Sequence, residues 1–248
     1  MIQYHGSPLS GDAEQQINFY RGRHVLVSYA TYRDMHTVIT DVCSSFCLDN
    51  GAYSFWKSGT EISWKDFYLW LDKWVSHPKF DFFFIPDVIG QDKENENNQL
   101  VAGCPVKFDK KHFACPVYHL GESLKRIDFF HELGYRRFAV GSTPGFELKS
   151  LMFWNDMRKV FDHICENGVP KFKVHGLRML DPEIVEAFPF SSGDSTNATL
   201  ESTFDYKWLK YPYAPESKSG RAALVADKMA RSQSPSFYKN KPVQMELI

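Results

Sequence analysis

The sequence has few cysteines and no spacing that pairs them. Its 248 residues include 5 cysteines, an odd number. Cys43 and Cys47 form the one close pair, and no second pair completes the ligand set of a structural zinc site. This pattern is typical of reduced thiols and argues against a disulfide-stabilised secreted scaffold. We therefore expect a cytoplasmic protein without a bound metal.

Long apolar runs and a targeting signal are missing as well. No stretch approaches the roughly 18 apolar residues that a membrane-spanning helix needs. Met1 to Asp12 are too polar for a secretory signal peptide. No association with a membrane is expected.

Common nucleotide-binding and hydrolase motifs are also absent. The chain has no glycine-rich phosphate loop, no Walker motif and no Gly-x-Ser-x-Gly nucleophile elbow. It has no internal repeat either. These absences argue against P-loop chemistry and against a serine hydrolase built on that elbow, and no cofactor is expected.

A net charge of only −1 excludes a uniformly basic nucleic-acid-binding chain, but the charge is unevenly distributed. From Lys207 to Lys241 basic residues outnumber acids, and aromatic residues lie between them. Such a segment suits a polyanion with exposed bases. A solvated tail would have the same composition. The candidates for nucleic-acid contact are Lys207, Lys210, Lys218 and Arg221.

Short apolar runs alternate with amphipathic or polar segments along most of the chain. Strands are predicted at 24–30, 45–48, 80–86, 114–118, 137–140, 171–174 and within 188–196, and helices at 63–74, 92–101, 123–133, 148–167 and 182–187. This order predicts a parallel sheet with helices outside it. Seven such units favour an α/β fold of the (β/α)8 TIM-like barrel class, with an irregular eighth unit near 203–210 or an incomplete barrel.

The composition changes after Pro212, where Pro, Ser and Lys become frequent. Residues 1–211 are therefore predicted to form the barrel. Residues 212–248 are predicted to form a basic and aromatic C-terminal extension that is partly ordered.

Polar residues and glycines stand where the predicted strands end. Because a barrel collects its strand C-termini at one face, three carboxylates and an imidazole would converge there. Two facing carboxylates suit glycosyl transfer, in which one attacks the anomeric carbon and the other handles a proton. The same groups could instead hold a divalent ion, or each could close a turn, cap a helix or serve as a structural histidine. These strand-end positions are Asp49, Asp87, His119, Gly141, Gly176 and Asp194.

Five short segments, taken in order, resemble the tRNA-guanine transglycosylases. Residues 48–54, Leu-Asp-Asn-Gly-Ala-Tyr-Ser, are similar to that family's Asp-Ser-Gly-Gly-Phe segment, and Ile85-Pro-Asp87 resembles the segment that holds its base-recognising Asp. Residues 138–142 are similar to its Leu-Ala-Val-Gly, and residues 174–177 to its Met-Gly-Val-Gly. Ser192-Gly-Asp-Ser195 stands where the family has its nucleophilic Asp. The resemblance covers residues 24–196.

The form of these segments is most similar to the small, phage-encoded DNA-guanine transglycosylases, which exchange guanine in DNA for a 7-deazaguanine. Two features depart from the tRNA enzymes. No cysteine follows Cys165, so their zinc subdomain is lacking, and His119 stands where they carry Gln. The resemblance therefore implies DNA as the substrate and, for a phage protein, the cytoplasm of a bacterial host as the location.

The resemblance also implies roles for single residues. Asp194 would be the nucleophile that forms a covalent glycosyl-enzyme, and Asp49 the general acid and base. The partners would be DNA and a free 7-deazaguanine base, with no cofactor and no metal. The residues that would bind the base are Asp87, His119, Gly141, Ser142, His175, Gly176 and Tyr53.

Three other functions fit the same residues. The first is the same exchange on tRNA. The second is a catalytically inactive relative that only binds nucleic acid. The third is a barrel hydrolase that cuts the N-glycosidic bond and leaves abasic DNA.

Overall fold

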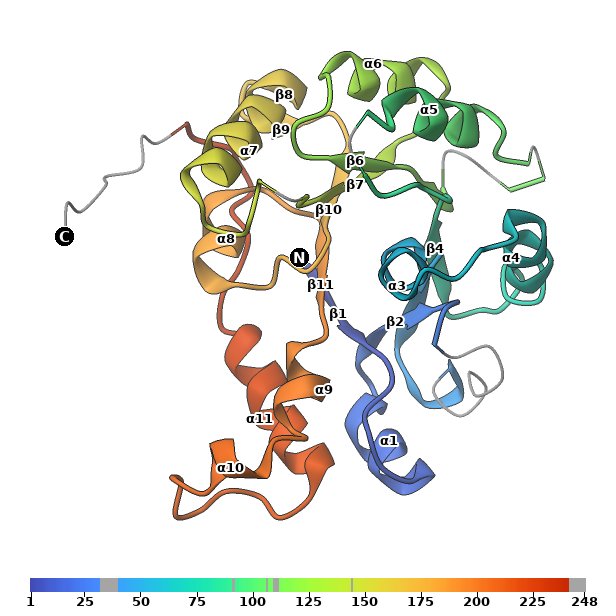
Figure 1. The fold of residues 1–248 in the computed structure, drawn as a ribbon. Coiled ribbons are helices and arrows are strands. Elements are labelled where there is room, and N and C mark those ends of the chain that lie inside the picture. The colour runs from blue at the N-terminus through green and yellow to red at the C-terminus, as the bar shows by residue number, and fades with distance from the viewer. Residues whose placement is uncertain (32–39, 91, 106, 109–111, 144, 241–248) are drawn as a thin grey trace.

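The computed structural model describes residues 1–31, 40–90, 92–105, 107–108, 112–143 and 145–240. It shows an α/β fold in which one parallel sheet curves into a nearly closed barrel (Figure 1). The strands of this sheet are β1 (Ile2–Gly6), β2 (His24–Ser28), β3 (Ser45–Asp49), β4 (Phe80–Phe84), β5 (Ala114–Cys115), β6 (Val117–His119), β7 (Arg137–Gly141), β10 (Lys173–Gly176) and β11 (Ser192–Ser195). A separate antiparallel hairpin joins β8 (Cys165–Glu166) and β9 (Val169–Pro170).

Helices surround the sheet and follow most of its strands (Figure 1). They are α1 (Ala13–Tyr20), α3 (Ala52–Ser58), α4 (Trp64–Leu71), α5 (Glu94–Ala102), α6 (Lys125–Glu132), α7 (Leu151–Ile164), α8 (Pro182–Ala187), α9 (Asn197–Glu201), α10 (Asp205–Trp208) and α11 (Lys218–Met229). The predicted capping at Ser63 is confirmed, because its side chain accepts a hydrogen bond from the Asp66 N–H at the start of α4. Among the described residues, no helix has both the length and the apolar character needed to cross a membrane.

The two ends of the sheet meet at Pro116. The strand order is β5-β4-β3-β2-β1-β11-β10-β7-β6, and only Pro116 separates β5 from β6 along the chain. Proline has no N–H to donate to a neighbouring strand, so the ladder is interrupted there. The chain pairs with β4 before Pro116 and with β7 after it, and the Pro116 carbonyl accepts a hydrogen bond of 2.9 Å from the Ala139 N–H. This exchange of partners brings the sheet close to closure.

The strand that the sequence pattern leaves unplaced lies at the N-terminus. The prediction of an eighth strand near 203–210 is wrong, because those residues include the helical turn α10. Instead β1 pairs with β11 on one side and with β2 on the other. The segment Ile2–Gly6 escapes detection because it lacks an apolar run. The Gln3 amide on this strand donates to the Met229 carbonyl at the end of α11, at 3.2 Å.

Two apolar layers hold the barrel together. Alternate residues of a strand face opposite sides of a sheet, and in β4 Phe82 and Phe84 point inward while Phe83 points toward the helices. The interior layer is small and consists of Tyr4, Leu26, Cys47, Phe82, Phe84, Cys115, Val117 and Ala139. A larger layer lies between the sheet and the helices. The strand predicted at 80–86 is therefore confirmed over Phe80–Phe84, where it is buried on both faces apart from the partly exposed Asp81.

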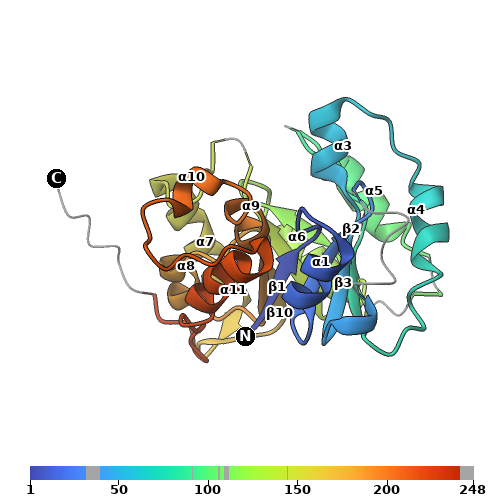
Figure 2. The same cartoon turned by 90° about the horizontal axis from the view of Figure 1, so that it is seen from below.

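Part of the predicted C-terminal extension is a well-formed helix. The N-terminus of α11 is capped by the Ser217 side chain, and the helix packs against α1 and α9. Ala222 and Ala226 are fully buried there, since small side chains let neighbouring helices approach closely. Figure 2 shows α11 beside α1 and α9, and it places α3 and α10 toward one end of the barrel and the N-terminus at the other. Residues 241–248 of the predicted extension lie outside the described residues.

Candidate active site

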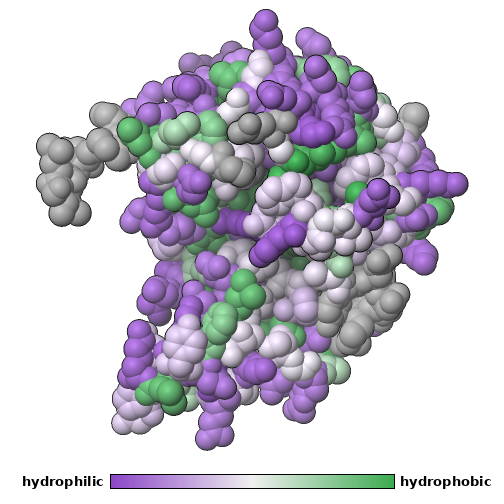
Figure 3. Space-filling model, viewed as in Figure 1, coloured by the Kyte–Doolittle hydropathy of each residue, from purple (hydrophilic) through white to green (hydrophobic). Residues whose placement is uncertain are grey.

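A pocket of about 440 Å³ opens where the barrel strands end. It brings together five of the six strand-end positions, namely Asp49, Asp87, His119, Gly141 and Asp194. Its lining also includes Ser142 and Tyr53, which the resemblance implies as base-binding residues. Apolar walls come from Leu26, Phe84, Val117 and Leu177. Figure 3 shows the face in the orientation of Figure 1, where hydrophilic side chains predominate and hydrophobic ones form smaller patches. The pocket thus combines several carboxylates with apolar side chains.

Asp194 is buried on β11, with 4% of its surface exposed. Its Oδ1 atom accepts a hydrogen bond of 3.0 Å from the Arg178 N–H and lies 3.1 Å from His175 Nε2. In the described part of the chain both interactions go to the same oxygen, so Oδ2 is left for a substrate in the pocket. Two donors on one oxygen fix the direction of the carboxylate.

His175 supports Asp194 from within the barrel. Its ring is fully buried, and Nδ1 lies 2.9 Å from Ser192 Oγ. Burial lowers the pKa of His175, although Asp194 opposes this shift. A carboxylate only accepts hydrogen bonds, so we infer that neutral His175 carries its proton on Nε2 and accepts one from the Ser192 hydroxyl on Nδ1. The structure therefore places His175 behind Asp194 and outside the pocket lining.

Asp49 ends β3, and the strands β2 and β1 lie between it and β11, the strand of Asp194. Its Oδ2 atom accepts a hydrogen bond of 3.1 Å from the Gly51 N–H. Burial raises the pKa of Asp49 to about 6, and the nearby charges of Asp87 and Asp194 add to the shift, while hydrogen bonds from Ser28 and Gly51 oppose it. A carboxyl group with this pKa exchanges a proton readily near neutral pH.

The turn after Asp49 requires glycine and supplies a residue that the sequence pattern does not reveal. Gly51 has φ of +80°, and a Cβ there would lie 2.7 Å from the Ala30 Cβ. From the same turn Asn50 contacts the end of the neighbouring strand β4, where its Nδ2 donates to Asp87 Oδ1 at 2.8 Å. Asn in such a turn is ordinary. Only the fold reveals that it also holds Asp87.

Asp87 and His119 form a buried pair beside Asn50. His119 Nε2 lies 2.9 Å from Asp87 Oδ2. Burial alone would lower the pKa of His119, but hydrogen bonds and charge interactions with Asp87 and Glu122 raise it to about 9. His119 is therefore an imidazolium at neutral pH.

Arg178 is a second pocket residue that the sequence pattern misses. Its guanidinium carbon lies 3.9 Å from the centre of the Tyr53 ring, and its backbone has φ of +60°. This left-handed conformation aims the Arg178 N–H at Asp194. Tyr53 is therefore at the pocket, as predicted, but a cation covers one face of its ring. A single arginine after a strand carries no signal for this role.

Gly141 and Gly176 differ in what surrounds them. Gly141 lines the pocket, and a Cβ there would meet the Leu177 Cδ1 atom at 3.4 Å, an ordinary contact. Gly176 lies outside the lining, and a Cβ there would come within 2.9 Å of the Met179 Cβ and 3.1 Å of the Phe190 ring. The packing around residue 176 therefore requires glycine, whereas a Cβ at residue 141 would fit without displacing other protein atoms.

Replacing Gly176 with Ala is expected to lower the free energy of unfolding by about 1–3 kcal/mol, because the added methyl group overpacks the barrel wall. The matched variant Gly141→Ala should change it by less than about 1 kcal/mol. Urea unfolding monitored by circular dichroism measures both. Equal stability losses in the two variants would contradict the packing assignment.

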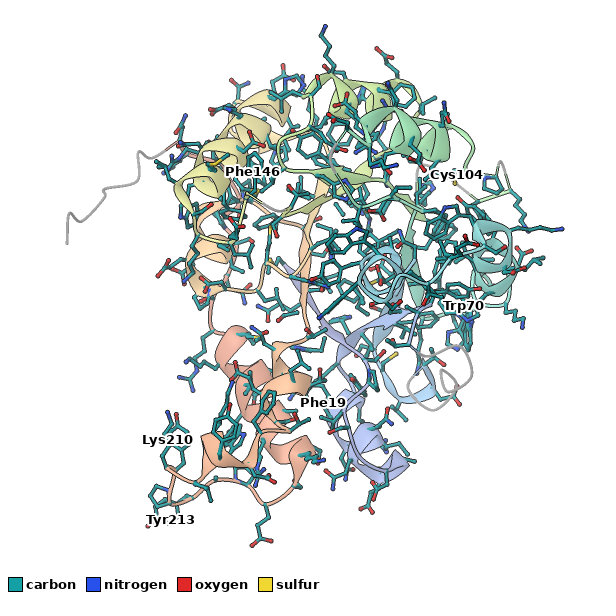
Figure 4. All side chains as sticks on the ribbon, in the orientation of Figure 1. Phe19, Trp70, Cys104, Phe146, Lys210 and Tyr213 are labelled. Carbon is teal, nitrogen blue, oxygen red and sulfur yellow. The ribbon has the colours of Figure 1, made fainter. Side chains whose placement is uncertain are left out.

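The four basic residues predicted to contact nucleic acid lie outside the pocket. Lys207 Nζ lies 5.1 Å from the Phe204 ring centre and Lys210 Nζ lies 5.2 Å from that of Tyr211. Lys218 donates to Ser10 Oγ, and Arg221 pairs with Asp205. In Figure 4, Lys210 and Tyr213 lie at the outer edge of the molecule, and Tyr213 is 96% exposed.

The ring of Phe146, in the segment between β7 and α7, lies outside the pocket. Phe146 packs over Gly121, where a Cβ would lie 2.7 Å from its ring, and it is not part of the pocket lining. Within the described ranges, no group of three or more His, Cys, Asp or Glu side chains has an arrangement that could hold a metal ion.

Chemically, the pocket offers one oriented carboxylate, one carboxyl group that titrates near neutral pH and one buried anion held by an imidazolium. Comparisons with protein-family models, curated proteins and solved structures found no match, so the geometry of this pocket carries the functional argument.

Proposed function

We propose that the protein is a DNA-guanine transglycosylase, which exchanges guanine in DNA for a free 7-deazaguanine base through a covalent intermediate on Asp194. The observation that carries this proposal is the pairing of Asp49 and Asp194 in one pocket with different environments. Asp194 is oriented by two donors through one oxygen, and Asp49 has a pKa raised to about 6. A nucleophile and a separate acid–base group are what a double displacement at a sugar carbon needs.

In the first displacement, Asp194 Oδ2 attacks C1′ of a deoxyguanosine. The C1′–N9 bond breaks, its electron pair leaves with guanine, and the Asp49 carboxyl group supplies the proton that neutralises the base. In the second, the incoming base loses its N9 proton to the Asp49 carboxylate and attacks C1′, and the ester to Asp194 breaks. Two displacements preserve the configuration at C1′. One N-glycosidic bond replaces another, so no energy carrier is required.

Asp87 is the group in the pocket that suits a guanine edge. An ionised carboxylate accepts hydrogen bonds from the N1–H and the exocyclic amino group of guanine, and a 7-deazaguanine has the same two donors. Adenine presents an acceptor at N1, which an anion would repel. Phe84, Val117 and Leu177 supply apolar walls for a flat base. The room beside Gly141 lets a base approach the backbone there.

The finer architecture also supports the proposal. If β5 and β6 are counted as one strand interrupted at Pro116, the sheet has the eight strands of a TIM-like barrel. In such barrels the chemistry lies at the C-terminal ends of the strands, where this pocket is.

The target base must leave the helical stack to enter the pocket, at a cost of roughly a few kcal/mol. The exposed residues on and after α10 are suited to hold the strand around such a base. Tyr206, Tyr211 and Tyr213 are exposed, and Lys207 and Lys210 lie among them. Aromatic rings stack on bases and lysines attract phosphates. This surface lies toward the same end of the barrel as α3 (Figure 2).

The proposal is tested by incubating the protein with DNA or with tRNA in the presence of labelled guanine or a 7-deazaguanine, followed by nucleoside mass spectrometry. We expect the label or the modified nucleoside in DNA and not in tRNA. Incorporation into tRNA alone would favour the tRNA enzyme. Abasic sites formed whether or not a free base is supplied would favour an N-glycosidase, and no change in either nucleic acid would favour an inactive binding protein.

A further inference from the structure

We propose that Glu122 and Arg126 are positioning residues for the base-binding anion. In this arrangement Glu122 and Arg126 hold His119 as an imidazolium, and His119 together with Asn50 holds Asp87 as an ionised acceptor directed at the pocket. The identity of the base rests on the proposed function, whereas the arrangement of the four charged groups does not.

The loop after β6 reverses direction and places the Glu122 side chain beside His119. The Glu122 Oε2 atom accepts a hydrogen bond of 2.7 Å from the His119 N–H, and its Oε1 atom lies 3.4 Å from His119 Nδ1. Gly121 makes this reversal with φ of +95°, and its N–H donates to Asp156 at 2.7 Å. The loop is thus fixed from α7 as well as from within.

Both ring nitrogens of His119 face carboxylates. Nε2 lies 2.9 Å from Asp87 and Nδ1 lies 3.4 Å from Glu122. Ionised carboxylates only accept hydrogen bonds, so each nitrogen must carry a proton and the ring must be charged. Neither N–H is then free to donate to a base. His119 therefore acts through Asp87 and does not bind the base with a ring nitrogen.

Arg126 completes the charge balance. Its side chain is fully buried, and Nη1 donates to Glu122 and to the Val117 carbonyl, while Nε donates to Asn98 at 2.8 Å. Two anions and two cations then alternate from Asp87 to Arg126, with a formal sum of zero. Buried charges are tolerated when they are paired in this way. Loss of one member leaves a net charge in the barrel wall.

The consequence for function is selectivity. An Asp87 fixed by Asn50 on one oxygen and His119 on the other presents its remaining lone pairs to the pocket in one orientation. A base with two adjacent N–H donors matches that anion, and a base with an acceptor there is rejected. Other titratable groups also face this network. They include Tyr118 of β6, Asp49 of β3, Glu94 of α5, Asp156 of α7 and the pocket residue Glu147.

The test uses the full-length protein with nitrogen-15-labelled histidine and follows the His119 ring signals by NMR as a function of pH. We expect wild-type His119 to lose its proton near pH 9. In Glu122→Gln its pKa should fall, because an anion beside Nδ1 is lost, and the KM for the free base should rise at least about tenfold with a smaller change in kcat. Glu122→Asp should restore part of both properties.

Asp128→Asn is the matched control, because it breaks a more exposed His–Asp pair, between Asp128 of α6 and His163 of α7. It should change neither the His119 signals nor the KM. Titration of wild-type His119 near its ordinary pKa of 6.5 would overturn the inference, and so would an unchanged KM in folded Glu122→Gln. The wild-type titration needs no variant, so misfolding of Glu122→Gln leaves the test intact. If His119 titrates near pH 9 but the protein has no exchange activity, the proposed function is refuted, whereas the arrangement of the four charged groups is still supported.

Discussion

Replacing Asp194 with Asn is expected to lower the rate of base exchange by at least about a thousandfold. The amide has no negative charge and cannot form the ester with C1′. It is close to the carboxylate in size, and its oxygen can still accept from His175 and from the Arg178 N–H. We therefore expect a folded but inactive protein. Nucleoside mass spectrometry of DNA treated with each protein measures the loss.

The intermediate gives a second and more direct readout. Wild-type protein mixed with an oligonucleotide and no free base should show a covalent adduct by mass spectrometry after denaturation, and Asp194→Asn should show none. Ser195→Ala is a suitable control, because Ser195 is the neighbour of Asp194 in the sequence. Its hydroxyl accepts a hydrogen bond from the Asn197 N–H and does not bond the Asp194 carboxylate. This variant should keep most of the activity. Exchange by Asp194→Asn at the wild-type rate would assign the nucleophile elsewhere, with Asp49 the next carboxylate to consider.

The positions of the three acids could be predicted because parallel strands end on one face. Asp49, Asp87 and Asp194 follow or close apolar or small-residue strands, and that local pattern is legible in the sequence. The strand β1 could not be predicted in this way. Its Gln3 and His5 face the surrounding helices, where Gln3 bonds the end of α11 and His5 packs on Phe19. A strand covered by polar contacts has no apolar alternation to detect.

The residues that hold the acids could not be predicted because their partners are far away in the sequence. Asn50 bonds Asp87, which lies 37 residues later, and Arg178 directs its N–H at Asp194. Each of these contacts depends on the fold placing the loop after one strand beside the end of another strand. Glu122 is closer to His119, but its return depends on the left-handed Gly121. Spacing alone does not distinguish such a turn from a helix start.

Replacing Asp49 with Asn is expected to slow exchange by about 10²- to 10⁴-fold, the usual contribution of a general acid–base group. In the wild type, Asp49 must be protonated for guanine to leave and ionised for the new base to enter. With a pKa of about 6, single-turnover release of guanine should fall as pH rises above 6, and entry of the new base should fall as pH drops below 6. Steady-state exchange should therefore peak near pH 6.

Ser28→Ala provides an independent check on this assignment. The Ser28 hydroxyl bonds Asp49 and lowers its pKa, so its removal should raise that pKa and move both limbs of the profile to higher pH. A profile centred at the same pH in Ser28→Ala would assign the titration to another group. The pH profile of exchange by Asp49→Asn should show no change in rate near pH 6.

The raised pKa of Asp49 also predicts that Asp49→Asn, although less active, is more stable than the wild type at neutral pH. The pKa of Asp49 is raised in the folded protein from an ordinary value of 3.8 to about 6. Its neutral form therefore favours folding, and stability decreases as pH rises from about 4 to about 6 and stays lower above that. Asn cannot ionise, so Asp49→Asn should be more stable than the wild type at pH 7 by about 1–3 kcal/mol and nearly equal to it at pH 4. Urea unfolding at both pH values measures this difference. A variant that is inactive and more stable has lost a catalytic group, whereas one that is inactive and less stable at pH 7 would show that Asp49 supports the fold.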